Sequence, residues 1–147
     1  MFRNILVPTD GSAPSRKAIQ RAVRLAKEQK ARITGFYVGP AWQLPVYGEY
    51  LPPEMLSEKA HVAAVRKTAT RYLGAVKKAA AAAGVRCKCA YVLGDYPHAE
   101  IIKAARRNRC DLIVIASHGR RGISRLLLGS ETSKVLAHST VPVLVVR

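Results

Sequence analysis

The residues best suited to chemistry lie in a glycine-rich segment near the C-terminus, which runs into the start of a helix. Gly119 and Gly122 are three apart, and Gly129 and Ser130 follow. Glycines let backbone N–H groups approach an anion closely, and a helix start adds unpaired N–H groups and the positive end of the helix dipole. The segment also carries three cations: Arg120, Arg121 and Arg125. Together these features predict a phosphate site.

The glycine-rich segment is not one of the widespread nucleotide motifs. The pattern GxxxxGK[ST] is absent from the chain, and GxGxxG does not follow the first apolar run. Glycines before a helix also serve as ordinary turns and caps. A phosphate site and a simple turn therefore both remain open from these residues alone.

A second polar loop, Pro8-Thr9-Asp10-Gly11-Ser12, follows the first apolar run of the chain. In open α/β sheets, ligands bind beyond the carboxyl ends of the strands, where the strand order reverses. We expect this loop to face the glycine-rich segment if the strands that precede them are neighbours. Two purely structural alternatives stay open: Asp10 is a turn residue only, and His118 is a loop side chain without a functional role.

Five short apolar runs predict five strands, because β-branched runs bounded by glycine or proline are typical of strands. They span residues 3–7, 32–38, 85–92, 111–115 and 141–146. The first, fourth and fifth are almost uninterrupted, as expected for strands covered on both faces. The segment from Ala41 to Pro52 contains Trp42 and several prolines and tyrosines, and we expect a surface excursion or lid there.

Four helices are predicted between the strands. They are expected from a Ser12 cap to about Lys30, from Pro53 to Ala83 with Gly84 as the stop, from an Asp95 cap through Ala105, and from a Ser130 cap through Leu136. Strict alternation of strands and helices indicates an α/β fold, with a five-stranded parallel sheet and helices on both faces. The 147 residues are expected to form a single domain.

The chain is strongly basic, with 25 Lys and Arg against 9 Asp and Glu and a formal charge of +16. Such a charge attracts polyanions weakly and without specificity. Seven of the basic residues lie between Arg16 and Arg32, at spacings typical of a solvated helix face. A dedicated nucleic-acid surface is the sharper alternative, but the chain lacks RNP-like, zinc-finger and KH-type signatures.

The three cysteines, Cys87, Cys89 and Cys110, do not suggest a disulfide framework, because their number is odd. We expect them to be reduced and mostly buried, with Cys87 and Cys89 on the same side of a strand. The N-terminus shows no secretory leader, and no 18-residue window is apolar and uncharged. We therefore expect a cytoplasmic protein that does not insert into membranes.

These segments resemble the universal stress protein family over the whole chain. The matching stretches are residues 5–12 (ILVPTDGS), 111–119 (DLIVIASHG) with Gly129-Ser130, and 141–146 (VPVLVV). ATP-binding members carry the signature G-x2-G-x9-G-[ST]. Gly119 and Gly129-Ser130 fit its second half, whereas Ala116 stands at its first glycine. The resemblance implies a Rossmann-like, adenine nucleotide alpha hydrolase-like fold with strand order 3-2-1-4-5.

The resemblance also implies a set of binding residues. Pro8, Thr9 and Asp10 would border the adenosine, with Asp10 near the ribose or a metal, and the backbone of Val38 would hydrogen-bond adenine. Ribose and phosphates would be wrapped by Ala116, Ser117, His118, Gly119, Arg120, Arg121 and Gly122. The phosphate end would be held by Gly129, Ser130, Glu131 and Thr132. We expect the Glu131 carboxylate to point away from phosphates and Gly129 to need a positive φ.

The expected function is an ATP-binding, nucleotide-dependent regulator of stress responses, with or without Mg²⁺. No catalytic residues are assigned, because no P-loop lysine or general base for the γ-phosphate is evident, and any hydrolysis should be slow. The resemblance implies a homodimer through the C-terminal strand, and we expect that strand to be buried on both faces with a free backbone edge. The alternatives are a basic adaptor for nucleic acid or anionic surfaces, and a genuine ATPase.

Overall fold

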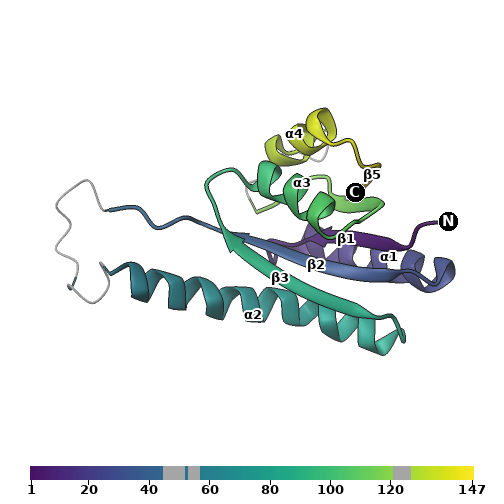
Figure 1. Cartoon of the computed structure of the whole chain (residues 1–147), viewed down its shortest axis with the longest axis horizontal. Helices are drawn as coiled ribbons and strands as arrows, with labels where there is room; N and C mark the ends of the chain where they lie inside the picture. Colours follow the sequence, from purple (N-terminus) through teal and green to yellow (C-terminus); the bar gives the residue numbers. More distant parts are fainter. Residues whose placement is uncertain (45–51, 53–56, 121–126) are drawn as a thin grey trace.

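The structure is a computed structural model that describes residues 1–44, 52, 57–120 and 127–147. Strands and helices alternate along the chain (Figure 1). In order, they are β1 (Asn4–Pro8), α1 (Ala13–Gln29), β2 (Arg32–Gly39), α2 (Glu58–Ala82), β3 (Cys87–Leu93), α3 (Pro97–Arg107), β4 (Leu112–Ala116), α4 (Ser130–His138) and β5 (Val143–Val146). The tyrosines of the expected excursion, Tyr47 and Tyr50, lie outside the described residues.

The five strands form one parallel sheet in the order β3-β2-β1-β4-β5, which confirms the predicted fold class and strand order. The central strand β1 pairs on one side with β2, where Ile5 lies beside Ile33, and on the other with β4, where Ile5 lies beside Leu112. The order reverses between β1 and β4. This switch point brings the loops after β1 and β4 to the same end of the sheet.

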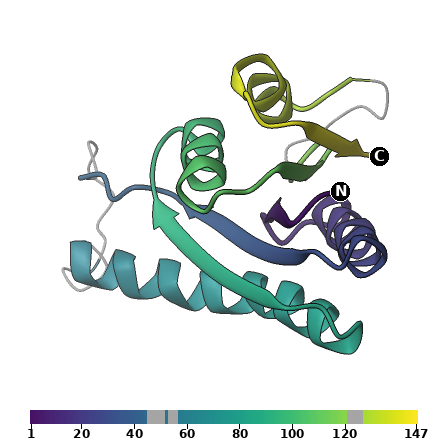
Figure 2. The same ribbon diagram turned by 45° about the vertical axis from the view of Figure 1, so that its right-hand side comes forward.

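Helices cover both faces of the sheet (Figure 2). On one face, α1 and α2 pack over side chains such as Ile5, Val7 and Val114. On the other face, α3 and α4 pack over alternate residues of the same strands, including Leu6 and Ile113. All five of these side chains are fully buried, as expected for strands covered on both faces. No helix of the described residues is long and apolar enough to cross a membrane.

Two helix starts on the α1 and α2 face depend on serine caps. Ser12 caps α1 as predicted, and its side chain accepts a hydrogen bond from the Ser15 N–H at 3.2 Å. The expected start of α2 at Pro53 is wrong, although Pro53 itself lies outside the described residues. Ser57 has extended backbone and caps the helix by accepting from the Ala60 N–H at 3.0 Å, so α2 begins at Glu58.

Two predicted caps on the other face are wrong by one residue. The residue before α3 is Tyr96 rather than Asp95, and it makes no side-chain cap; Pro97 opens the helix, where its missing N–H is tolerated. The residue before α4 is Gly129, and Ser130 is the first helical residue. Gly129 has φ −61° and ψ 152°, so the expected positive φ is also wrong.

Strand β5 begins at Val143, two residues later than predicted. Its expected burial on both faces is also wrong, because Leu144 is 43% exposed in the described structure. Pro142 still contributes to the ladder through its carbonyl, which accepts from the Ile113 N–H at 2.9 Å. The other element bounds differ from the predictions by one or two residues, the usual uncertainty of element ends.

Candidate functional site

The loop between β1 and α1 is held by its own side chains. Asp10 Oδ1 accepts a hydrogen bond from the Ser12 N–H at 2.9 Å, which closes an Asx turn. Thr9 Oγ1 accepts from the Gly11 N–H at 3.2 Å and lies 2.9 Å from Ser15 Oγ. Gly11 has φ +75°, and a Cβ there would collide with the ring of Tyr72. Only glycine therefore fits this turn under helix α2.

The loops after β1 and β4 are joined through Asp10 and Arg120, as expected for neighbouring strands. The backbone N–H of Arg120 donates to Asp10 Oδ2 at 3.0 Å, and Arg120 Nε donates to the Asp10 carbonyl at 2.9 Å. A Cβ at Gly119 would collide with Asp10 Oδ2, so this close approach requires glycine. Asp10 is thus more than a local turn residue, because it fixes the relative position of the two loops.

An arginine-rich pocket of about 400 Å³ opens beside this junction, on the side covered by α1 and α2. The guanidinium of Arg120 hydrogen-bonds the Tyr72 hydroxyl, and the Cζ atoms of Arg120 and Arg71 each lie 5.1 Å from the Tyr72 ring centroid. The ring centroids of Tyr37 and Tyr72 are 5.3 Å apart, and the two rings meet edge-on. Burial raises the pKa of the Tyr37 phenol. The pocket is lined by Thr9, Gly11, Arg16, Ile19, Arg71, Tyr72, Ala75 and Arg120.

Sequence reasoning did not include Arg16, Arg71 or Tyr72 in the site. Arg16 belongs to the basic run between Arg16 and Arg32, and Arg71 and Tyr72 lie inside the second predicted helix without a motif that would mark them. Three guanidinium groups around one pocket attract an anionic ligand.

Val38 offers backbone groups at the end of the sheet. In β2, the carbonyl of Phe36 accepts from the Thr9 N–H at 2.9 Å, whereas the carbonyl of Gly39 accepts from the Gly94 N–H beyond β3. Alternate residues of a strand direct their backbone groups to opposite neighbours, so Val38 faces the β1 side, like Phe36. Because β1 ends at Pro8, beside Phe36, the N–H and C=O of Val38 lie past the end of that pairing.

The start of α4 lies against the loop after β4. The Gly129 N–H donates to the Ser117 carbonyl at 2.7 Å, and the first intrahelical bond runs from the Ser133 N–H to the Gly129 carbonyl. The amides of Ser130, Glu131 and Thr132 therefore precede the intrahelical ladder, where a helix can bind an anion. A Cβ at Gly129 would come within 3.1 Å of the His118 Cα, so space rather than φ favours glycine there.

Two side chains of this segment have structural partners. The buried Thr132 Oγ1 donates to the Ala116 carbonyl at 2.8 Å, and Ser117 Oγ lies 3.0 Å from His118 Nδ1. These contacts hold the segment together and do not involve the backbone N–H groups in the first turn of α4. Of the predicted site residues, Arg121 and Gly122 lie outside the described residues.

The Glu131 side chain points away from the helix start and joins α4 to α3. Its Oε2 accepts from the His98 N–H at 2.8 Å and lies 3.0 Å from His98 Nδ1, while Oε1 accepts from Lys134 Nζ at 3.2 Å. Partial burial raises the pKa of Glu131, but the hydrogen bonds from His98 and Lys134 outweigh it, and the pKa is lowered overall. His98 is thus a half-buried link between two helices.

The site fits a nucleotide better than a bare metal ion. Its one carboxylate, Asp10, already accepts a backbone hydrogen bond on each oxygen. The described residues contain no group of three or more potential metal ligands. Magnesium is usually held by few protein carboxylates together with phosphates and water, so Asp10 suits Mg²⁺ only alongside a phosphate ligand.

A five-stranded parallel sheet with polar loops at its switch point defines a Rossmann-like α/β protein. The model described as "Universal stress protein family" matches residues 1–147, and the chain belongs to that family. Universal stress protein YxiE of Bacillus subtilis is 36% identical over 151 positions that cover 100% of both chains.

Solved structures share the fold. The structure of MJ0577, a universal stress protein of Methanocaldococcus jannaschii, has a TM-score of 0.82 at 28% identity and covers 99% of this chain and 96% of that chain. A universal stress protein family member from Arabidopsis thaliana with AMP bound has a TM-score of 0.66 at 19% identity, over 98% of this chain and 90% of that chain. At that identity, the likeness concerns the fold alone.

Proposed function

We propose that this universal stress protein binds an adenine nucleotide, ATP with or without Mg²⁺, and acts as a nucleotide-dependent regulator in stress responses. One observation carries the proposal. The backbone groups of Val38, the Asp10–Arg120 junction and the first turn of α4 all open on the carboxyl end of the same sheet. These are three kinds of partner, suited to a base, a ribose and a phosphate chain.

The adenine end rests on Val38. Adenine carries a donor amino group beside an acceptor ring nitrogen, and Val38 directs a backbone acceptor and donor past the end of β1. Such a contact uses backbone atoms and does not depend on which side chain the residue carries. The backbone of Val38 is therefore suited to recognise the hydrogen-bonding edge of adenine.

The phosphate end rests on the first turn of α4. The amides of Ser130, Glu131 and Thr132 supply donors, and the helix dipole adds positive potential. The carboxylate of Glu131 is engaged by His98, on the side of α3, so it does not oppose a phosphate at these amides. AMP bound to the Arabidopsis relative of the same fold supports an adenine nucleotide as the ligand class.

A binding role is favoured over rapid catalysis. The junction carries one carboxylate, both of whose oxygens accept backbone hydrogen bonds, and the chain lacks the lysine of a P-loop. If ATP is bound with Mg²⁺, Asp10 would be the carboxylate beside the metal. We expect turnover below about 1 s⁻¹, at the slow end of enzyme rates. Phosphate release at ordinary ATPase rates would contradict this part of the proposal.

The decisive experiment compares two glycine variants by titration calorimetry with ATP, AMP and cAMP. Gly129→Val keeps an extended backbone that valine readily adopts, but its side chain would crowd His118 and the helix start. We expect affinity to fall by about two orders of magnitude, equivalent to about 2.7 kcal/mol. Gly74→Val is the matched control, because a Cβ there meets nothing within 4 Å. Unchanged affinity in Gly129→Val would overturn the phosphate-site assignment.

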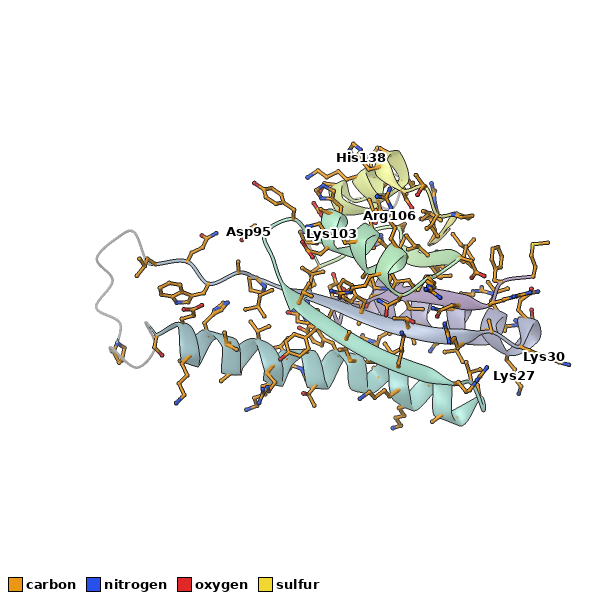
Figure 3. The ribbon with its side chains drawn as sticks, in the orientation of Figure 1. Lys27, Lys30, Asp95, Lys103, Arg106 and His138 are labelled. Carbon is orange, nitrogen blue, oxygen red and sulfur yellow. The ribbon has the colours of Figure 1, made fainter. Side chains whose placement is uncertain are left out.

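The positive charge supports only weak binding of other polyanions. The basic side chains are spread over both helical layers, as Figure 3 shows for Lys27 and Lys30 at the end of α1 and for Lys103 and Arg106 on α3. A dispersed charge lacks the single basic face of a dedicated nucleic-acid binder. Binding to nucleic acid should therefore weaken steeply with salt, and nucleotide binding much less.

We further propose a homodimer through β5. This strand lies at one edge of the sheet formed by the described residues, and edge strands invite pairing with another chain. Leu144 on β5 and Leu136 on α4 are 43% and 41% exposed. A second copy paired along β5 would cover apolar surface of this kind and satisfy the backbone edge.

A further inference from the structure

Two cysteines lie side by side on strand β3, at the edge of the sheet that the described residues form. Cys87 and Cys89 are two residues apart, so both side chains point to the face covered by α2. Their Sγ atoms are 3.8 Å apart, and both residues are half-buried. The third cysteine, Cys110, is buried against the other face of the sheet.

The two thiols differ in their surroundings. The Sγ atom of Cys89 is 3.8 Å from Cys87 Sγ and 3.9 Å from the Leu73 carbonyl. The hydrogen bond from Cys89 lowers the pKa of Cys87 to about 7, and the charge of Lys77 on α2 acts in the same direction. The same hydrogen bond and burial raise the pKa of Cys89. Near neutral pH, Cys87 is therefore partly ionised to a nucleophilic thiolate, with the Cys89 thiol beside it.

We propose that Cys87 and Cys89 form a peroxide-sensitive dithiol that closes reversibly to a disulfide within β3. In the first step, the Cys87 thiolate attacks one oxygen of a hydroperoxide. A sulfur–oxygen bond forms and the oxygen–oxygen bond breaks. Cys87 becomes a sulfenic acid, and the peroxide is reduced to an alcohol, or to water when the oxidant is hydrogen peroxide.

In the second step, the Cys89 sulfur attacks the sulfur of the Cys87 sulfenic acid. The sulfur–sulfur bond forms as the sulfur–oxygen bond breaks, and the hydroxide leaves as water with the proton of Cys89. The dithiol has then lost two electrons and two protons to the peroxide. A thiol reductant restores the pair by exchange.

The strand can accommodate the closure. The sulfurs must approach from 3.8 Å to about 2.05 Å, which requires a local change of pleat. In the sheet that the described residues form, β3 is an edge strand paired with β2, so such a change disturbs that one ladder. Across that ladder, Cys89 lies beside Gly35, and a Cβ at Gly35 would come within 2.8 Å of Cys89 Sγ. Glycine at this position leaves the sulfur the room that it needs.

The test treats the reduced full-length protein with hydrogen peroxide and follows it by intact mass and non-reducing peptide mapping. The wild type should lose about 2 Da, link the two cysteines in one peptide, and regain the mass with dithiothreitol. Cys110→Ser is the matched control and should behave like the wild type. Cys89→Ser should stop at the sulfenic acid, which adds about 16 Da and reacts with dimedone.

Cys87→Ser tests the order of the steps, because it removes the thiolate and should slow oxidation on the order of tenfold. Dimedone labelling of the wild type equal to that of Cys89→Ser would overturn the proposal. So would disulfides between chains in place of the internal one, or oxidation of Cys87→Ser at the wild-type rate. Each readout is a change in the mass of the protein or of its peptides and needs no nucleotide, so the outcome is independent of the proposed function.

Discussion

Arg120 and Asp10 lie 110 residues apart in the chain and are joined by two hydrogen bonds. Both bonds involve backbone atoms: the Arg120 N–H donates to the Asp10 carboxylate, and Arg120 Nε donates to the Asp10 carbonyl. The carboxylate simultaneously accepts from the Ser12 N–H at 2.9 Å. One acidic side chain therefore sets both the local turn and the separation of the two loops at the switch point.

Replacing Asp10 should loosen this junction. Asp10→Ala removes both acceptors of the carboxylate, and we expect the free energy of unfolding to fall by about 1–2 kcal/mol in urea denaturation. Asp10→Asn turns an N–H₂ group toward the Arg120 N–H and loses that hydrogen bond. It keeps an oxygen for the Ser12 N–H, so the free energy of unfolding should fall less than in Asp10→Ala. Equal stability of Asp10→Ala and the wild type would show that the link contributes nothing to folding.

Gly74→Ala should stabilise the protein. Gly74 lies inside α2, and a Cβ there meets nothing within 4 Å. Alanine restricts the unfolded chain and favours helix, so the free energy of unfolding should rise by about 0.5–1 kcal/mol. Thermal unfolding followed by circular dichroism measures this. Gly11→Ala provides the contrast, since it combines φ +75° with a collision at Tyr72 and should destabilise.

The stability of the α3–α4 pair should depend on pH in the acid range. Partial burial raises the pKa of Glu131, but the hydrogen bonds from His98 and Lys134 outweigh this effect and lower the pKa in the folded protein from its ordinary value of 4.5. A lowered folded-state pKa gives stability that is present above about pH 4.5 and is lost as the pH falls through the folded value. Glu131→Gln should therefore flatten the acid side of a plot of melting temperature against pH.

Glu28→Gln is the control for that experiment, because Glu28 pairs with Arg24 on an exposed helix face. It should reproduce the wild-type profile closely. A Glu131→Gln profile with the full wild-type slope would place the acid sensitivity elsewhere in the molecule.

Two proline variants of β5 should separate dimerisation from folding. The Pro142 and Val146 carbonyls accept from β4 and from Ser117, so even-numbered residues of this strand face β4 and odd-numbered ones face the free edge. Val143→Pro removes an N–H from the free edge and should yield a folded monomer in sedimentation. Leu144→Pro removes an N–H from the β4 ladder and should lower stability as well. A monomeric wild type at micromolar concentration would contradict the dimer.

Much of the sheet could be predicted from the sequence because its information is local. Runs such as residues 112–116 are apolar throughout and bounded by the polar residues Asp111 and Ser117, which is typical of a buried parallel strand. Helix caps were harder. Serine is a common helix cap, so the sequence predicts Ser130 as the cap of α4, whereas the close approach of Gly129 to His118 depends on the three-dimensional structure.

The missed parts of the site depend on long-range packing. Tyr72 reads as a core residue of a helix stripe, and only the way α2 lies across the β1–α1 loop places its ring beside Arg120. The contact between His98 and Glu131 spans 33 residues and depends on α3 and α4 lying together. No spacing rule links such residues, so their roles could not be read from one sequence.

Ser117 has a consequence for the coupling of binding and assembly. Its N–H donates to the Val146 carbonyl at the end of β5, and its carbonyl accepts from the Gly129 N–H at the start of α4. A single residue thus makes backbone hydrogen bonds both to the edge strand and to the helix start. If the proposed nucleotide prefers the proposed pairing of β5, thermodynamic linkage requires the effect to be reciprocal: the nucleotide would tighten self-association by the same factor as pairing would tighten nucleotide binding.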